Sequence, residues 1–170
     1  MQETETRSIF VTGLRNAHAM ENQALSIMKP QLARIETYPE VAAQLDKHFR
    51  ETEGQIKRLE DVLHQLGEDH STLKDMALSF SGTMAAMGHT IAGDEILKNS
   101  FANFAFENFE IAAYKSLRTI AELGGFPSAI SAIDANLAEE QAMASWLDAN
   151  IRGVTMKFAS LREAGETAKI

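Results

Sequence analysis

The amino-acid sequence predicts an all-α fold, and two observations carry this prediction. Three long stretches lack glycine and are rich in Ala, Leu, Glu, Gln and Met, which favour helix: Leu14 to Glu53, Asp94 to Leu123 and Phe126 to Arg152. No stretch alternates β-branched and polar residues as a half-buried strand does. With 170 residues, of which 45% are hydrophobic, the chain suits one domain with a substantial core.

The first two long helices are expected to form a hairpin. The first is predicted from Ser8 into the mid-thirties, with a bend at Pro30, where a backbone N–H is missing. The second is predicted after Thr37, which with Glu40 has capping-box spacing, and it should end at Gly67. The expected core residues follow steps of three and four: Leu14, His18, Glu21, Leu25, Met28, Leu32 and Ile35, then Val41, Leu45, His48, Thr52, Gln55, Leu59 and Leu66.

The second half of the chain predicts another hairpin, reached through a long crossover over residues 68–93 that carries a short helix at about residues 72–87. A third long helix is expected from Asp94 to Leu123, stopped by Gly124 and Gly125, and a fourth from Pro127 to the late 150s. The sum is a single domain of residues 1–170, an antiparallel four-helix bundle with ferritin-like connectivity. Flexible tails are expected at residues 1–7 and 160–170.

Composition argues against several classes of function. The 24 acidic residues exceed the 16 Lys and Arg, giving a net charge of −8, which argues against nonspecific nucleic-acid binding. No segment approaches the ~20 apolar residues of a membrane span, and the acidic N-terminus does not resemble a secretory signal, so a cytoplasmic location is expected. Without cysteine, any metal would have to be held by carboxylate and imidazole groups.

Polar residues interrupt the core stripe of every long helix. Glu21 occupies a central core position of the first helix and Glu140 one of the fourth, while Glu107 and Glu110 share one side of the third. The second helix has a polar stretch with His48, Glu51, Thr52 and Gln55. Counting residues outward from the two hairpin turns brings these segments to one depth, within about one helical turn. Because unpaired buried carboxylates are costly, the convergence predicts binding of divalent iron or manganese.

Four segments resemble the bacterial YciF/YciE family of ferritin-like, stress-associated proteins: AMENQ at 19–23, HFRETEGQIKRLE at 48–60, AFENFEIAAYKSLRTIAEL at 105–123 and LAEEQA at 137–142. The resemblance covers nearly the whole chain. Its most specific part is E-x-x-E followed by I-A-A-Y on the third helix, which is also similar to rubrerythrin-type di-iron bundles. The resemblance implies a di-metal carboxylate protein that reacts with dioxygen or peroxide, as a ferroxidase- or peroxidase-type oxidoreductase.

Carried over residue by residue, the resemblance implies five metal ligands: Glu21, Glu51, Glu107, Glu110 and Glu140. Glu51 and Glu110 would bridge two ions, and the others would be terminal ligands. His48 and Glu53 are further candidates. No histidine follows Glu51 or Glu140 by three residues, as it does in the familiar di-iron pattern. The expected site is therefore rich in carboxylate and poor in imidazole, with iron or manganese as its metal.

Other interpretations remain open at this point. The glutamates of the first and fourth helices could pair with Arg58, Arg118 or Lys115, and Tyr114 could either hydrogen-bond a ligating carboxylate or simply pack. The chain could also be a non-catalytic stress-response protein with a structural metal or none. A homodimer is expected, formed through the aromatic face of the third helix, which carries Phe101, Phe104, Phe106 and Phe109.

Overall fold

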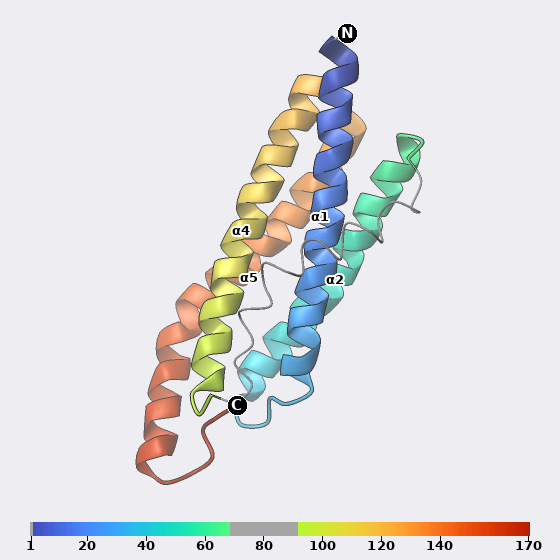
Figure 1. Ribbon diagram of the computed structural model, residues 1–170. Helices are drawn as coiled ribbons and strands as arrows, with labels where there is room; N and C mark the ends of the chain where they lie inside the picture. The colour runs from blue at the N-terminus through green and yellow to red at the C-terminus, as the bar shows by residue number, and fades with distance from the viewer. Residues whose placement is uncertain (1, 69–91) are drawn as a thin grey trace.

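The structure of the chain is a computed structural model that describes residues 2–68 and 92–170. Four long helices dominate these residues (Figure 1): α1 (Gln2–Leu32), α2 (Pro39–Gln65), α4 (Glu95–Gly124) and α5 (Pro127–Glu163). α1 and α5 run in one direction, and α2 and α4 run in the opposite direction. α1 packs against α2 and α4, and α5 packs against the same two helices. Every neighbouring pair is therefore antiparallel. The predicted all-α, ferritin-like four-helix bundle is confirmed, and the short helix predicted over residues 72–87 lies outside the described residues.

Two helices end at glycines, as the sequence predicted. Gly67 after α2 has a φ of 75° and Gly125 after α4 a φ of 69°, a left-handed conformation that glycine adopts without steric cost. The Phe126 N–H then donates to the Ala121 carbonyl at 2.9 Å, which closes the last turn of α4. The chain reverses there and begins α5 at Pro127.

Two helix starts differ from the sequence prediction. α1 begins at Gln2 instead of Ser8, so residues 2–7, expected as a flexible tail, continue the first helix. At α2 the predicted capping box is wrong, because Tyr38 is the N-cap and, among the described residues, no side chain caps this helix end. Pro39 at the first helical position has no backbone N–H that would need a capping partner.

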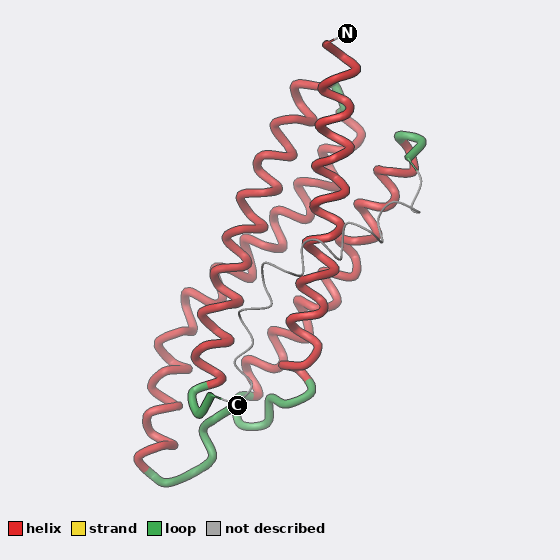
Figure 2. The backbone as a smooth tube through the Cα atoms, in the orientation of Figure 1, coloured by secondary structure: helices red, strands yellow, loops and turns green. Residues whose placement is uncertain are grey.

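The C-terminal segment, also expected as a flexible tail at residues 160–170, is held against the bundle. α5 continues to Glu163, and the chain then folds back towards the starts of α2 and α4 (Figure 2). The Tyr38 hydroxyl donates to the Ala168 carbonyl at 2.7 Å, and the Ile96 N–H donates to the Lys169 carbonyl at 2.9 Å. The second bond satisfies an N–H in the first turn of α4 that has no partner within its own helix.

The main apolar core is built by all four helices. Phe10 of α1 and Phe126 at the α4–α5 turn stack with ring centroids 4.7 Å apart. Buried aliphatic and aromatic side chains continue the core along the bundle, among them Leu14, Met20, Leu45, Leu59, Phe106, Leu117, Ile133 and Leu147. Within the part of the chain that the structure describes, no helix is both long and apolar enough to cross a membrane.

Candidate metal centre

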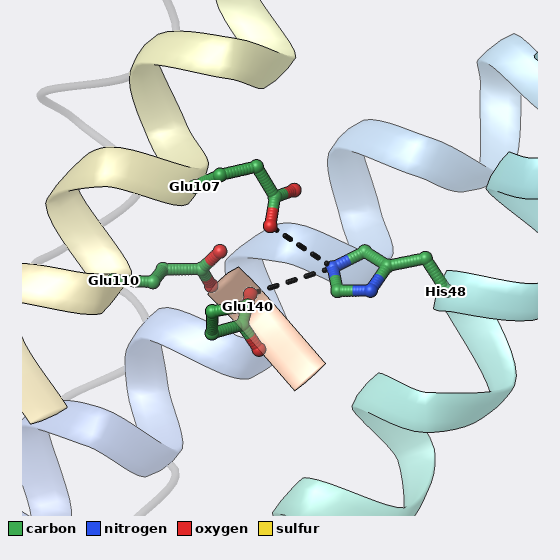
Figure 3. Close-up of side chains that lie close together, drawn as sticks. All are labelled: His48, Glu107, Glu110 and Glu140. Atoms are coloured by element: carbon green, nitrogen blue, oxygen red, sulfur yellow. Dashed lines mark ion pairs between the residues drawn. The ribbon is translucent and has the colours of Figure 1, made fainter. Parts of the chain in front are cut away.

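Near the middle of the bundle, four buried side chains from three helices converge (Figure 3). His48 comes from α2, Glu107 and Glu110 from α4, and Glu140 from α5. One nitrogen or oxygen atom from each lies within 4.8 Å of the others. The His48 Nε2 atom lies 3.3 Å from Glu107 Oε2 and 3.5 Å from Glu140 Oε2, the two dashed lines in Figure 3. We call these four residues the carboxylate cluster.

Helical periodicity brings these side chains together. Glu107 and Glu110 are three residues apart, so both lie on the face of α4 that also buries Phe106 and Tyr114. On α2 and α5 the cluster residues occupy buried stripes that are otherwise largely apolar: Val41, Leu45, His48, Thr52, Gln55 and Leu59, and Ile133, Asn136, Glu140, Ala144 and Leu147. The same pattern that packs the bundle therefore carries polar groups into its centre.

Glu21, the first of the expected ligands, lies next to the carboxylate cluster but outside the group of four. Its side chain on α1 is fully buried, and the Tyr114 hydroxyl donates a hydrogen bond to its Oε1 atom. Burial, followed by the charge of Glu140, raises the pKa of Glu21 well above its usual range. Asn136, which the sequence reasoning did not single out, donates to the Tyr114 hydroxyl at 2.9 Å. The one sequence feature that could have indicated Asn136 is that it is a polar residue among the buried positions of α5.

Glu51 and Glu53, also expected as ligands, are not part of the cluster. His48 takes the inward position on α2, and at 100° per residue Glu51 and Glu53 point to other sides of the helix. Glu51 lies at the margin, where its Oε1 pairs with Lys47 at 2.9 Å and its Oε2 lies 3.3 Å from His48 Nδ1. Glu53 is exposed. The sequence feature that indicated His48 was the helical spacing of the buried positions on α2. Residue 48 fits the steps of three and four between these positions, and residue 51 does not.

Burial and neighbouring charges shift the pKa values in the cluster. Burial raises the pKa of Glu107 to about 8, and burial together with the charges of Glu21 and Glu140 raises the pKa of Glu110 well above its usual range. Burial alone would lower the pKa of His48, but the adjacent Glu107 and Glu140 raise it to about 11. Burial would raise the pKa of Glu140, yet the adjacent His48 lowers it. In a metal-free cluster these shifts favour a protonated His48 and an ionised Glu140, and they oppose the ionisation of Glu107 and Glu110.

Neither Arg58 nor Arg118 neutralises the carboxylate cluster. Arg58 and Arg118, considered as partners from the sequence, form their ion pairs with carboxylates outside the cluster. Within residues 2–68 and 92–170, both oxygens of Glu110 and of Glu140 are buried without a hydrogen-bond partner, although His48 forms its ion pair with Glu140. Buried carboxylates without such partners cost free energy unless protons or a cation compensate them.

The donor set fits a divalent cation. Cation–oxygen distances of about 2.0–2.6 Å put opposite ligands about 4–5 Å apart, which accommodates the 4.8 Å spread of the cluster. Carboxylates and imidazole together suit iron and manganese. The His48 Nδ1 contact with Glu51 is of the kind that orients a metal-binding histidine and leaves Nε2 for the metal.

Comparison with known proteins agrees with the fold and with the resemblance noted in the sequence. Residues 5–160 match the family described as a domain of unknown function, DUF892. The protein YciF of Escherichia coli (strain K12) is 28% identical over 142 residues, 79% of this chain and 82% of that protein. A crystal structure of a Xanthomonas campestris pv. campestris protein is 26% identical with a TM-score of 0.79, over 94% of this chain and 99% of that one. The crystal structure of the E. coli stress protein YciF is 25% identical with a TM-score of 0.72, over 86% and 94%.

Proposed function

The chain belongs to the DUF892 family, and we propose that it is a cytoplasmic, ferritin-like carboxylate protein that binds two ions of iron or manganese and reacts with dioxygen or peroxide in stress defence. The observation that carries this proposal is the carboxylate cluster, in which three glutamates and a histidine from three helices are buried with their donor atoms within 4.8 Å. The description of its E. coli relative as a stress protein supports the physiological part.

The cluster residues would hold the first ion through His48 Nε2 and oxygens of Glu107, Glu110 and Glu140. Glu21 would contribute to a second ion together with Glu110 and Glu140, whose charges act on one another. Iron or manganese, when bound, would supply the electrons that reduce dioxygen or peroxide. The chain's own contribution is to hold the ligands in a buried site among packed side chains, so that bulk water is kept from the centre.

The test is elemental analysis of the full chain, purified without added metal and without a metal affinity resin, before and after incubation with ferrous iron or Mn²⁺. About two ions per chain are expected, as in other carboxylate bundles of this architecture. Anomalous scattering at the iron edge should locate them beside His48 and Glu140. The matched control is the double variant His48→Leu, Glu140→Leu, which should bind none. A wild-type chain that takes up no metal at this position contradicts the proposal.

A second candidate is a non-catalytic stress-response protein with a structural metal or none. The observation in its favour is that protonated His48 lies against Glu107 and Glu140, so protons alone can balance the cluster. Consumption of dioxygen or peroxide after addition of ferrous iron separates the two functions. A redox protein consumes the oxidant and loses turnover in Glu21→Ala and Glu140→Ala, whereas a structural protein shows no turnover to lose.

The expected homodimer also belongs to this proposal. Phe101 and Phe109 of α4 and Ile9 of α1 are each about half exposed. A hollow of about 600 Å³ between these two helices is lined by small and apolar residues, including Gly13, Ala17 and Ala113. An uncharged face of this kind suits a second copy of the chain. Sedimentation velocity should report a dimer that Phe109→Glu dissociates, while Leu123→Glu, at another exposed apolar position of α4, should leave it intact.

A further inference from the structure

Hydrogen bonds link the bundle surface to Glu21 through one residue from each helix. Arg58 of α2 donates from Nε to Asn136 Oδ1 of α5 at 2.6 Å. Asn136 donates from Nδ2 to the hydroxyl oxygen of Tyr114 on α4 at 2.9 Å. The Tyr114 hydroxyl in turn donates to Glu21 Oε1 on α1. We call these four residues the cross-bundle chain.

Arg58, at the outer end of the cross-bundle chain, determines which group donates and which accepts in each of its hydrogen bonds. An arginine Nε–H can only donate, so the amide oxygen of Asn136 has to face Arg58. The amide nitrogen of Asn136 then has two donors, one for Tyr114 and one for the main-chain carbonyl of Gln55 at 3.4 Å, which can only accept. Tyr114 receives a hydrogen bond on its oxygen and has its single proton left for Glu21.

The two oxygens of Glu21 therefore differ. Oε1 accepts the hydrogen bond from Tyr114, whereas Oε2 is buried and has no hydrogen-bond partner within the described ranges 2–68 and 92–170. The carboxylate is close enough to Glu140 and Glu107 for their charges to act on it. Because one lone pair of Oε1 is engaged by the Tyr114 hydroxyl and Oε2 has none engaged, Oε2 is the oxygen better placed to bind a cation.

We infer that the cross-bundle chain is a positioning device: it presents Glu21 to the metal site as a ligand through Oε2 alone. The inference rests on the proposed metal-binding function and extends it to three residues that touch no metal. The outermost of them, Arg58, is about one-third exposed and is anchored by an ion pair with Glu139, which also accepts a hydrogen bond from Gln55 at 3.0 Å. A side chain at the surface thus determines how a buried ligand is oriented.

The test is a double-mutant cycle on Mn²⁺ affinity, measured by calorimetry on the full chain. Tyr114→Phe should weaken binding by about 10–100-fold, the usual effect of losing a hydrogen-bond partner of a ligand. Arg58→Met keeps the length of the side chain but removes its donors, and it should weaken binding in the same direction. In the Tyr114→Phe background Arg58→Met should cause no further loss, because its effect passes through Tyr114.

The matched control is Arg118→Met, since Arg118 is similarly exposed and also forms ion pairs with carboxylates, but has no bond to the cross-bundle chain. It should leave the affinity unchanged. Equal losses from Arg58→Met and Arg118→Met, or an undiminished loss in the Tyr114→Phe background, overturn the inference.

A second measurement needs no metal, so it tests the hydrogen-bond directions of the cross-bundle chain independently of the proposed metal binding. The hydroxyl proton of Tyr114 should give an exchange-protected NMR resonance in the metal-free chain, and Glu21→Leu should abolish it, because Asn136 offers Tyr114 a donor and no acceptor. A resonance that persists in Glu21→Leu contradicts the assigned polarity whether or not the wild-type chain binds Mn²⁺. If the wild-type chain shows the resonance but takes up no metal, the proposed function is contradicted, and so is the role of Glu21 as a ligand. The assigned directions of the hydrogen bonds are unaffected by that result.

Discussion

His48 Nε2 on α2 lies 3.3 Å from Glu107 Oε2 on α4, while the other ring nitrogen of His48 lies 3.3 Å from Glu51 Oε2. The imidazole is thus held between a buried carboxylate and one at the edge of the bundle. This arrangement gives His48 two possible states: a cation that pairs with Glu107 and Glu140, or a neutral ligand that donates from Nδ1 to Glu51.

Replacing His48 by leucine should abolish tight metal binding. The substitution removes the one nitrogen donor of the carboxylate cluster and leaves Glu107 and Glu140 without their cation. The loss of Mn²⁺ affinity should exceed the ~10–100-fold typical of losing an outer partner of a ligand. Calorimetric titration measures it, and His64→Leu, on the same helix but exposed, is the control. Equal affinities of the two variants would show that His48 is not a ligand.

Glu110→Met should raise the unfolding free energy of the metal-free chain. It should also abolish the further stabilisation that Mn²⁺ gives the wild-type chain. Neither oxygen of Glu110 has a hydrogen-bond partner among the residues described, and the charges of Glu21 and Glu140 act against its ionisation. Burying a polar group without a compensating hydrogen bond costs about 1–3 kcal/mol, and a methionine of similar volume removes that cost. Urea unfolding with and without Mn²⁺ checks both effects. Glu122→Met, at an exposed position of α4, should keep the stabilisation by Mn²⁺.

Metal affinity should rise with pH across the neutral range. Burial raises the pKa of Glu107 to about 8 and the pKa of Glu110 well above its usual range, so burial favours the protonated form of both carboxyls. A cation has to displace those protons, and raising the pH towards 8 and beyond removes them in advance. The slope of log Kd for Mn²⁺ against pH gives the number of protons displaced. An affinity independent of pH between 6 and 8 would mean that metal binding displaces no proton, so that the carboxyls are already ionised and His48 already neutral without metal.

Tyr38→Phe should loosen the C-terminal segment without affecting the metal centre. The Tyr38 hydroxyl is buried and donates to the Ala168 carbonyl at 2.7 Å, so its removal should cost about 1 kcal/mol of unfolding free energy. Amide hydrogen exchange should quicken at Ile96, whose N–H bonds the Lys169 carbonyl. Unchanged protection at Ile96 would indicate that the segment is held by its other contacts. Mn²⁺ affinity should stay at the wild-type value.

Much of the fold could be predicted because the signals for it are local. Gly124, Gly125 and Pro127 marked the α4–α5 turn through backbone conformations that only a few residues favour. Apart from the capping box predicted for α2, the errors concern the chain ends, where no periodic pattern exists. Residues 2–7 become helical as α1 is extended, and the C-terminal segment is fixed by bonds to Tyr38 and Ile96, more than 70 residues away in the sequence. Such long-range bonds leave no local pattern.

The type of candidate site could be predicted from the sequence, but not every residue that belongs to it. Glu107, Glu110 and Glu140 stood in core stripes, and their convergence followed from counting residues along the helices. On α2 the family resemblance implied Glu51 as the ligand, whereas the structure turns His48 inward, at the core position that the helical spacing had given it. A rotation of one helix by 60° decides between two residues that are three apart in the sequence, and that rotation is set by the packing of the whole α2 face.

The sequence by itself determined that glutamates would lie inside a helical bundle, because helical periodicity assigns each residue to a face regardless of the partner helices. It also determined the chemistry on offer, carboxylate and imidazole without thiolate. Only the tertiary structure decided which atoms meet: that His48 lies against Glu107, and that Tyr114 leaves a single oxygen of Glu21 free. Distances of about 3 Å between four helices depend on how the helices rotate and slide against one another, and these movements are settled by packing across the core rather than along the chain.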